Sequence, residues 1–447
     1  MKKKLLLINP VARYIKRKPR FLPYFGYAPF EPLNLAIIAA LTPDHWEIEI
    51  FDEILEPFSY READLVGITS YTGSAYRAYQ IAQQYRQNGT PVVMGGIHAS
   101  MMPEEAQQYV DSVVIGEAEG VWEKVISDFE TGQMQNLYRA EMLPMEGAPL
   151  PRRDLLSNHY SSSSVQTTRG CPKDCEFCSV TAFNGQHYRK RPVEEVLDEL
   201  ETISNRFIFF VDDNFLEKGK ESEERAMALF KGMIDRNIDK YWTCQAPISI
   251  ADNDELLHYA HKSGGRLILM GIESEKEEAL DTLGKKLNRK HVASYNDIFK
   301  RIHKHKICIV GTFIFGLDTD TPQDLYNRAK FIKKSRVDIV QPTILTPLPG
   351  TKLYDRFKEE NRLVHTNYPE DWEKYDWSQV VYEPARMSRE ELKKTMLKCW
   401  KSLGNWGTVL WKAIKTLFYT RSLLMAYGML NINYVYSMQY YRNEFRD

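Results

Sequence analysis

The stretch that decides the fold is Cys171-Pro172-Lys173-Asp174-Cys175-Glu176-Phe177-Cys178. It follows Gln166-Thr167-Thr168-Arg169-Gly170, which is typical of a short strand that ends in a glycine. Three thiols have the spacing C-x3-C-x2-C, and cysteine thiolates in one loop can bind one face of a four-iron cluster. Three cysteines leave one iron open to a substrate or cofactor, so the spacing indicates chemistry rather than electron transfer alone.

Two alternatives stay open on spacing alone. The three cysteines could bind zinc with a fourth ligand from elsewhere, or they could be reduced structural cysteines. A disulfide framework is not expected, because the chain is long and contains only six cysteines. The other three, Cys244, Cys308 and Cys399, are scattered, and we expect them to be small buried residues.

Composition limits the class of protein. The chain has 447 residues, which is enough for two or three domains. Its formal net charge is −1, so the charge balance does not favour a nucleic-acid partner. The N-terminal apolar run at 5–8 is too short for a secretory signal and is better explained as a buried strand. We therefore expect a cytoplasmic protein.

Strands and helices alternate over residues 1–140. We expect strands at 5–8, 47–51, 64–70, 91–94 and 113–115, with helices at 32–41 and 75–87. This α/β alternation predicts a doubly wound parallel sheet, a fold that binds ligands at the carboxyl ends of its strands. The candidate binding residues at those ends are Ser70, Tyr71, Thr72, Gly95, Gly96, His98, Gly116 and Glu117.

The alternation resumes after a predicted linker at 141–164, where prolines and the run Ser161-Ser162-Ser163-Ser164 interrupt any regular pattern. Residues 165–350 contain six strand–helix units, which predict a partial barrel with its chemistry at the carboxyl ends of the strands. The polar residues at those ends are Asp212, Asp213, Gln245 and Glu273. The simpler explanations are a turn cap for Asp213, a buried hydrogen bond for Gln245 and a surface salt bridge for Glu273.

Residues 351–447 are predicted to be mostly helical. We expect aromatic residues of this region, among them Trp372, Trp377 and Tyr382, to cap the open barrel. From Trp406 onward, aromatic and basic residues recur at helical intervals. This pattern fits either a helix that lies along a bilayer surface or, more simply, a helix packed on the barrel or on a partner.

The cysteine loop resembles the cluster loop of radical S-adenosylmethionine (SAM) enzymes. In that family, three cysteines hold a [4Fe-4S] cluster, SAM chelates the open iron, and the reduced cluster cleaves SAM to a 5′-deoxyadenosyl radical. The resemblance implies that Cys171, Cys175 and Cys178 are the cluster ligands. It also implies that Phe177 contacts the adenine of SAM.

The resemblance extends along the barrel. It implies that Asp212 and Asp213, after the second strand, contact the SAM amino group. Gln245, at the end of the third strand, would reach the SAM carboxylate or the substrate. Glu273, at the end of the fourth strand, would bind the ribose hydroxyls, and 311–316 would pack on the adenine.

Residues 1–140 resemble the cobalamin-binding domain that precedes the barrel in one large radical SAM class. The matching pieces follow in order, namely Asn9-Pro10, Pro32-Leu33-Asn34-Leu35, Gly67-Ile68-Thr69-Ser70, Gly95-Gly96-Ile97-His98 and Gly116-Glu117-Ala118-Glu119. No Asp-x-His-x-x-Gly motif is present, so we expect His98 to form hydrogen bonds in the pocket rather than bind cobalt. A domain that binds no corrin stays an alternative, because a fold does not fix its ligand.

Together the resemblances imply a cobalamin-dependent radical SAM methyltransferase that acts on an unactivated carbon of a small-molecule or lipid-like natural product. An external one-electron donor, such as flavodoxin or ferredoxin, would reduce the cluster. One alternative is a cyclase, oxidase or rearrangement enzyme of the same architecture. Another is an iron–sulfur or corrin sensor that does not turn SAM over. The C-terminal tail adds an expected peripheral contact with the inner face of the membrane.

Overall fold

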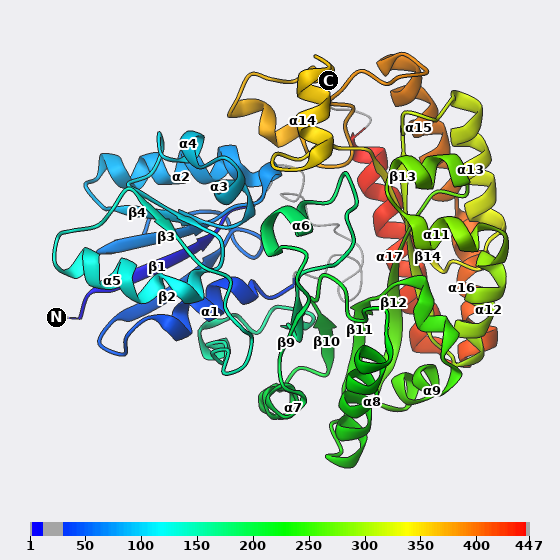
Figure 1. Ribbon diagram of the computed structural model, residues 1–447, viewed down its shortest axis with the longest axis horizontal. Coiled ribbons are helices and arrows are strands. Elements are labelled where there is room, and N and C mark those ends of the chain that lie inside the picture. Colours follow the sequence, from blue (N-terminus) through cyan, green and yellow to red (C-terminus); the bar gives the residue numbers. More distant parts are fainter. Residues whose placement is uncertain (1, 12–29, 444–447) are drawn as a thin grey trace.

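Two six-stranded parallel sheets organise the chain (Figure 1). The structure is a computed structural model that describes residues 2–11 and 30–443, without the side chains of 435 and 437–443. Figure 1 shows α6 (Ser179–Asn184), which follows the cysteine loop, between the two sheets. The loop with the three cysteines therefore lies where the two halves of the molecule meet.

The first sheet has the strand order β2-β1-β3-β4-β5-β6. Its strands are β1 (Lys4–Asn9), β2 (Glu47–Asp52), β3 (Leu65–Thr69), β4 (Val92–Gly95), β5 (Ser112–Ile115) and β6 (Leu137–Arg139). Its helices are α1 (Leu33–Leu41), α2 (Ala75–Gln87), α3 (Ile97–Met101), α4 (Pro103–Ala106) and α5 (Trp122–Glu130). β6 has no counterpart among the predicted strands.

Strand β1 shows why the apolar runs of this half become buried strands. Leu5 and Leu7 pack in one apolar layer with Trp122, whereas Leu6 and Ile8 pack in another layer on the opposite face. A parallel strand with helices over both faces is apolar at every position rather than at alternate ones. The predicted doubly wound sheet is confirmed.

The second sheet has the order β14-β13-β12-β11-β10-β7, and all of its neighbouring strands are parallel. Its strands are β7 (Ser163–Val165), β10 (Phe207–Phe210), β11 (Tyr241–Gln245), β12 (Gly265–Glu273), β13 (Cys308–Phe315) and β14 (Ile339–Ile344). Its helices are α7 (Val193–Thr202), α8 (Lys220–Asp235), α9 (Asp254–Lys262), α10 (Glu277–Thr282), α11 (Lys286–His291), α12 (Tyr295–Lys304) and α13 (Pro322–Lys334). The predicted partial barrel is confirmed.

The first barrel strand lies earlier than the sequence predicts. The sequence predicts that Ser163 and Ser164 lie in the linker, but they form the first two residues of β7 and are buried. Glu31 explains this placement, because its carboxylate accepts hydrogen bonds from the Ser163 hydroxyl at 2.5 Å and the Ser164 amide at 3.1 Å. The predicted strand at 166–170 instead contains β8 (Thr168–Arg169), which pairs with β9 (Arg189–Lys190) in a separate two-stranded sheet.

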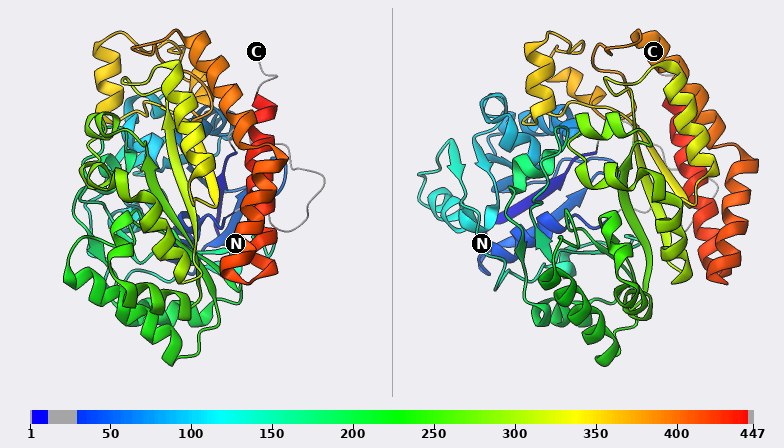
Figure 2. Two further views of the ribbon diagram at one scale, coloured as in Figure 1. Left: turned by 90° about the vertical axis from the view of Figure 1, so that its right-hand side faces the viewer. Right: turned by 45° about the vertical axis from the view of Figure 1, so that its right-hand side comes forward.

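The C-terminal region contains α14 (Lys352–Glu359), α15 (Arg389–Leu403), α16 (Trp406–Thr420) and α17 (Leu423–Asn443). Short 3-10 helices occur throughout the chain, namely η2 (Thr72–Ser74), η3 (Ala118–Gly120), η4 (Arg153–Leu155), η5 (Ile248–Asp252), η6 (Val292–Ser294) and η7 (Glu370–Lys374). Met429 of α17 packs on Cys308, Val310 and Ile339 of β13 and β14, on the side where Figure 2 shows α16 and α17 together. The simpler prediction, packing on the barrel, is therefore confirmed for α17. Within the described ranges, no helix has both the length and the apolar character that crossing a bilayer requires.

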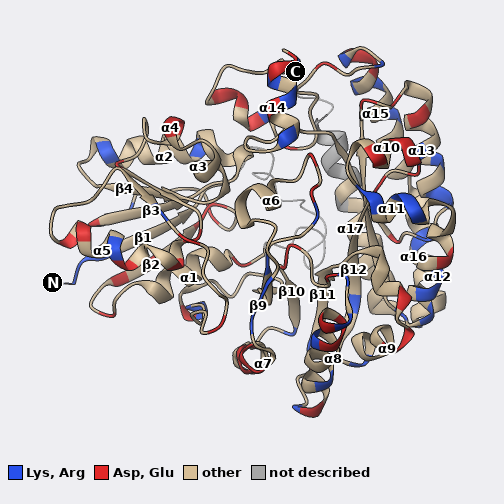
Figure 3. Ribbon diagram, viewed as in Figure 1, with Lys and Arg blue, Asp and Glu red and all other residues tan. Residues whose placement is uncertain are grey.

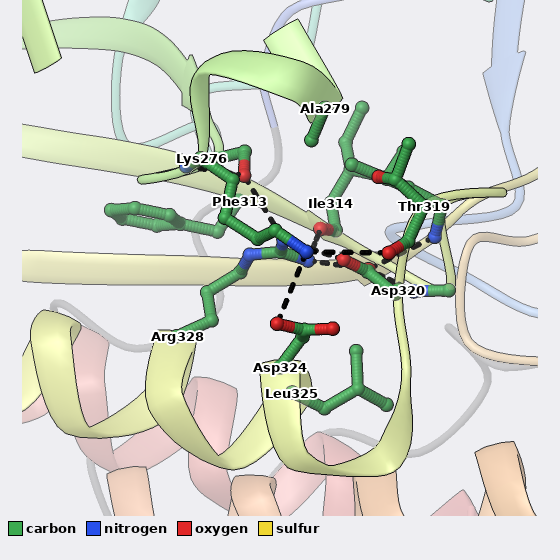
Figure 4. A network of polar contacts seen from close by, with 12 residues as sticks. Lys276, Ala279, Phe313, Ile314, Thr319, Asp320, Asp324, Leu325 and Arg328 are labelled. Atoms are coloured by element: carbon green, nitrogen blue, oxygen red, sulfur yellow. Dashed lines mark hydrogen bonds and ion pairs between the residues drawn. The ribbon is translucent and has the colours of Figure 1, made fainter. Parts of the chain in front are cut away.

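A buried arginine links the carboxyl ends of β12 and β13 to α13 (Figure 4). Arg328 has no exposed surface, and its two terminal nitrogens lie 2.7 and 2.8 Å from the two carboxylate oxygens of Asp320. Its Nε donates to Glu275 at 2.9 Å, and its terminal nitrogens also donate to the Ser274 hydroxyl and the Ile314 carbonyl. This fork fixes the segment directly after Glu273, which is one of the predicted site residues.

We expect Arg328→Lys to lower the free energy of unfolding by about 1–2 kcal/mol, because lysine keeps the charge but cannot form the two-pronged contact with Asp320. Denaturant titration followed by circular dichroism measures this change. The exposed Arg336 provides the matched control, and Arg336→Lys should change stability by less than about 0.5 kcal/mol. Equal effects of the two substitutions would contradict the assignment.

Candidate active site

The cysteine loop is held in a fixed shape at both of its ends. Gly170 has φ +85°, and a Cβ atom there would lie only 2.2 Å from the carbonyl oxygen of His187. Only glycine can therefore occupy the position before Cys171. Within the loop, the Cys178 amide donates to the Cys175 carbonyl at 3.1 Å. The close approach of Gly170 to the His187 carbonyl explains why the predicted strand ends in glycine.

Asp213 and Asp212 position this loop by accepting hydrogen bonds from the backbone just before Cys171. Asp213 accepts hydrogen bonds from the Gly170 amide at 2.9 Å and from the Asn184 side chain at 2.7 Å, so it joins the two ends of the loop. Asp212 is fully buried and accepts from the Thr167 amide and hydroxyl at 2.5 and 2.7 Å. Burial raises the pKa of Asp212 to about 6, although these hydrogen bonds oppose the rise. Contact of either carboxylate with SAM stays a prediction.

Glu273 ends β12 in a left-handed conformation with φ +64° and is nearly buried. Its carboxylate lies 2.9 Å from Nζ of Lys285 and accepts a hydrogen bond from the Thr312 hydroxyl at 3.2 Å. The predicted salt bridge is thus present, but it lies in the interior rather than on the surface. Gln245 lies on the neighbouring strand, level with Leu269 of β12, and its contact with SAM or substrate stays a prediction.

Lys285 places a positive charge beside the cysteines, and sequence reasoning missed it. Burial lowers the pKa of Lys285, but the charges of Glu273 and Cys175 outweigh burial and raise it above the ordinary value. Its Nζ lies 5.6 Å from the centre of the Phe177 ring. The preceding Gly284 has φ +71°, and a Cβ atom there would lie 3.0 Å from the carbonyl oxygen of Asp174. Glycine lets this segment approach the cysteine loop.

The donor set fits a [4Fe-4S] cluster. Cys171, Cys175 and Cys178 are all free thiols in one loop, and Lys173 and Lys285 lie near enough for their charges to act on Cys175. Across the described part of the chain, no three His, Cys, Asp or Glu side chains converge on a single ion. Cluster ligands need no such convergence, because each thiolate binds a different iron. Nearby cations also offset the negative charge that a cluster shares with its thiolates.

The predicted cobalamin edge is lined by residues that let the backbone come close to a ligand. Gly96 has φ +93°, and a Cβ atom there would lie 2.8 Å from the Thr69 hydroxyl and 3.0 Å from the Ser70 amide. Ser70 is buried, and its amide donates to the carbonyl of Gly95. Gly116, at the end of β5, donates its amide to Ser100 at 3.0 Å. Such an edge fits a large flat ligand.

Tyr71 lies at the same edge and has two properties that seldom occur together. Its side chain is 63 % exposed, yet the surrounding protein raises the pKa of its hydroxyl through burial. The binding role of Tyr71 and of the neighbouring buried Thr72 stays a prediction.

His98 forms hydrogen bonds that fix its ring. The ring is fully buried, with Nδ1 at 3.4 Å from the Thr72 hydroxyl and Nε2 at 3.3 Å from Glu105. Glu105 also accepts a hydrogen bond at 2.9 Å from Nε1 of Trp372, whose ring meets His98 edge-on. Trp372 therefore contacts the first half of the molecule. The backbone carbonyl of Trp377, by contrast, accepts a hydrogen bond from the amide of Ile344 at the end of β14.

Glu117 joins the two halves of the molecule directly. It follows β5, and its carboxylate lies 2.7 Å from Arg169 and forms a two-pronged contact with Arg189, including one of 2.8 Å. Burial raises the pKa of Glu117, but the two arginines outweigh burial and lower it below its ordinary value. Arg169 lies two residues before Cys171, so the predicted cobalamin loop is attached to the predicted cluster loop. Sequence reasoning missed both arginines.

Comparisons with known proteins agree with this arrangement. The model of the radical SAM superfamily matches residues 165–332, and that of the B12 binding domain matches residues 27–126. The chain is 31 % identical to bacteriochlorophyllide d C-12(1)-methyltransferase of Chlorobaculum tepidum, over 82 % of this chain and 81 % of that protein. It is 27 % identical to hopanoid C-2 methylase of Rhodopseudomonas palustris, over 75 % and 65 %.

The fold is similar to that of a solved radical SAM methyltransferase, TsrM from Kitasatospora setae with cobalamin and a [4Fe-4S] cluster bound. The TM-score is 0.63 at 18 % identity, and the match covers 89 % of this chain and 85 % of that one.

Proposed function

Because the chain belongs to the cobalamin-dependent radical SAM enzymes, we propose that it methylates an unactivated carbon of a lipid-like natural product. The observation that carries this proposal is the contact of Glu117 with Arg169 and Arg189. Transfer of a methyl group to a carbon radical requires both cofactors to reach one substrate atom, and proximity of this kind supplies much of the rate. The Glu117 contact holds the two cofactor loops together.

The cofactors of this family, a [4Fe-4S] cluster, SAM and cobalamin, supply hydrogen abstraction and a methyl group when bound. The chain's own residues do the rest. Cys171, Cys175 and Cys178 would hold the cluster, and Lys285 places a cation beside it. Asp213 fixes the loop that carries these cysteines.

The substrate class and the partners are part of the same proposal. The two relatives named above act, by their names, on a bacteriochlorophyllide and on a hopanoid, and both are large apolar ring systems. We infer that the substrate here is also large and apolar. An external one-electron donor would reduce the cluster, and the C-terminal tail would contact the inner face of a membrane.

Anaerobic turnover tests the reaction. Reconstituted protein with SAM, a reductant and a pooled lipid extract should release 5′-deoxyadenosine, bind about one corrin per chain, and move a labelled methyl group from SAM into a product. Absence of 5′-deoxyadenosine would favour a sensor, and an unlabelled product would favour a cyclase or oxidase. A Cys175→Ser variant is the control and should release no 5′-deoxyadenosine, because the cluster loses a ligand.

A further inference from the structure

The outer face of α16 and the start of α17 expose an unusual number of large apolar side chains. Nine of the seventeen large apolar side chains that are exposed in the described residues lie between Trp406 and Tyr427. These nine are Trp406, Leu410, Trp411, Ile414, Leu417, Phe418, Leu423, Leu424 and Tyr427, and we call them the outer apolar face. Phe418 is 79 % exposed and Trp411 is 54 % exposed. A contiguous apolar surface of this kind marks an interaction site.

The opposite side of α16 is already used for packing. Val409, Ala413 and Thr416 are buried, and Lys412 donates a hydrogen bond to the carbonyl of Val337 next to the barrel. The helix is therefore apolar on two sides. Among the described residues, the outer side stays largely exposed, although the Trp406 ring stacks on Tyr434 of α17. Burial within the protein explains why the inner side of α16 is apolar. It does not explain why the outer side is apolar as well.

The charged residues of the segment that contains this face are nearly all basic. Residues 392–443 contain eight lysines and arginines and no aspartate or glutamate. The tail thus carries a formal charge of +8, whereas the rest of the chain, with 51 basic and 60 acidic residues, carries −9. Acidic residues are common on helices such as α8 and α10 (Figure 3). Their absence from residues 392–443 favours a negatively charged partner.

The boundary of the outer apolar face has the pattern of an interfacial helix. Nζ of Lys415 lies 5.2 Å from the centre of the Trp411 ring, so a cation and an indole meet at the edge of the apolar surface. Arg421 ends α16 and is exposed. Aromatic residues on one side with lysine and arginine at the rim are the features by which helices lie in the headgroup region of anionic bilayers.

We propose that the outer apolar face binds the surface of an anionic lipid bilayer, with α16 lying in the plane of the interface. This inference rests on the proposed function, because a lipid-like substrate would be collected there. α17 packs on both α16 and β14, and β14 is an edge strand of the open barrel. A second copy of the chain fits less well, since symmetric pairing would bring two tails of charge +8 together.

Vesicle flotation with the full chain tests the proposal. We expect binding to vesicles of phosphatidylcholine with phosphatidylglycerol, weaker binding to phosphatidylcholine alone, and loss of binding at high salt. Trp411→Ser with Phe418→Ser should weaken binding by about tenfold or more, because two large apolar side chains no longer enter the bilayer. Lys415→Glu with Arg421→Glu should abolish the preference for phosphatidylglycerol.

Tyr326→Ser with Leu150→Ser is the matched control, since both side chains are exposed elsewhere, and it should leave binding unchanged. Circular dichroism and release of 5′-deoxyadenosine without vesicles should be normal in all variants, which separates this proposal from the proposed function. Vesicle binding without methyl transfer would overturn only the proposed function. Equal binding to both kinds of vesicle, or a dimer that the Trp411 and Phe418 substitutions dissociate, would overturn the membrane proposal.

Discussion

We expect the substitution Lys285→Met to slow SAM cleavage by about a hundredfold in the reconstituted enzyme, because a buried charge that is aimed at a reacting centre contributes on this scale. Lys285 is the cation that its buried ion pair with Glu273 holds in the charged form. The three cysteines are untouched, so iron content should stay normal. The reduction potential of the cluster should fall by an amount on the order of tens of millivolts, since a nearby positive charge stabilises the reduced state.

Two controls distinguish the effect of losing the Lys285 charge from the effect of destabilising the fold. Lys286→Met removes a neighbouring but exposed lysine and should have little effect on potential or rate. Lys285→Met also leaves Glu273 as a buried carboxylate without its cation, which costs stability. The double variant Lys285→Met with Glu273→Gln removes both charges and should recover stability but not SAM cleavage. Recovery of cleavage in that double variant, or an unchanged potential in the single variant, would refute the role of Lys285.

The sequence was informative wherever the signal was local. The three cysteines are recognisable from their spacing, and Gly170 is required by a backbone contact at the same place. Apolar runs such as 5–8 predicted strands because both faces of a parallel sheet are buried. The prediction for Ser163 and Ser164 was wrong, because serines seldom indicate a strand. Their partner, Glu31, lies more than a hundred residues away in the sequence.

The partners of the predicted residues were not readable for the same reason. Glu273 was predicted from its place at the end of a strand, but nothing local shows that Lys285 reaches it from the segment after α10. Glu117 was predicted from a motif as a cobalamin residue, whereas Arg169 and Arg189 belong to the other half of the chain. Pairing across the two halves exists only once both sheets have formed.

The contact between the halves leads to the second large effect. We expect Glu117→Gln to reduce methyl transfer by about a hundredfold, since small displacements of reacting groups have effects of this size. The neutral amide cannot form ion pairs with Arg169 and Arg189, so the cobalamin loop loses its attachment to the cluster loop. Release of 5′-deoxyadenosine should stay within a few-fold of the parent, because the cluster loop itself is unchanged.

The decisive quantity is therefore the ratio of methylated product to 5′-deoxyadenosine, measured with the corrin content of the same sample. Breaking the contact should lower this ratio while corrin and iron stay bound, because each cofactor keeps its own loop. Arg86→Met is the control, since it removes an ion pair with Asp111 that lies within the first half of the molecule. A parallel loss of corrin, 5′-deoxyadenosine and product would instead assign Glu117 to folding alone, because a purely structural contact lowers all three together.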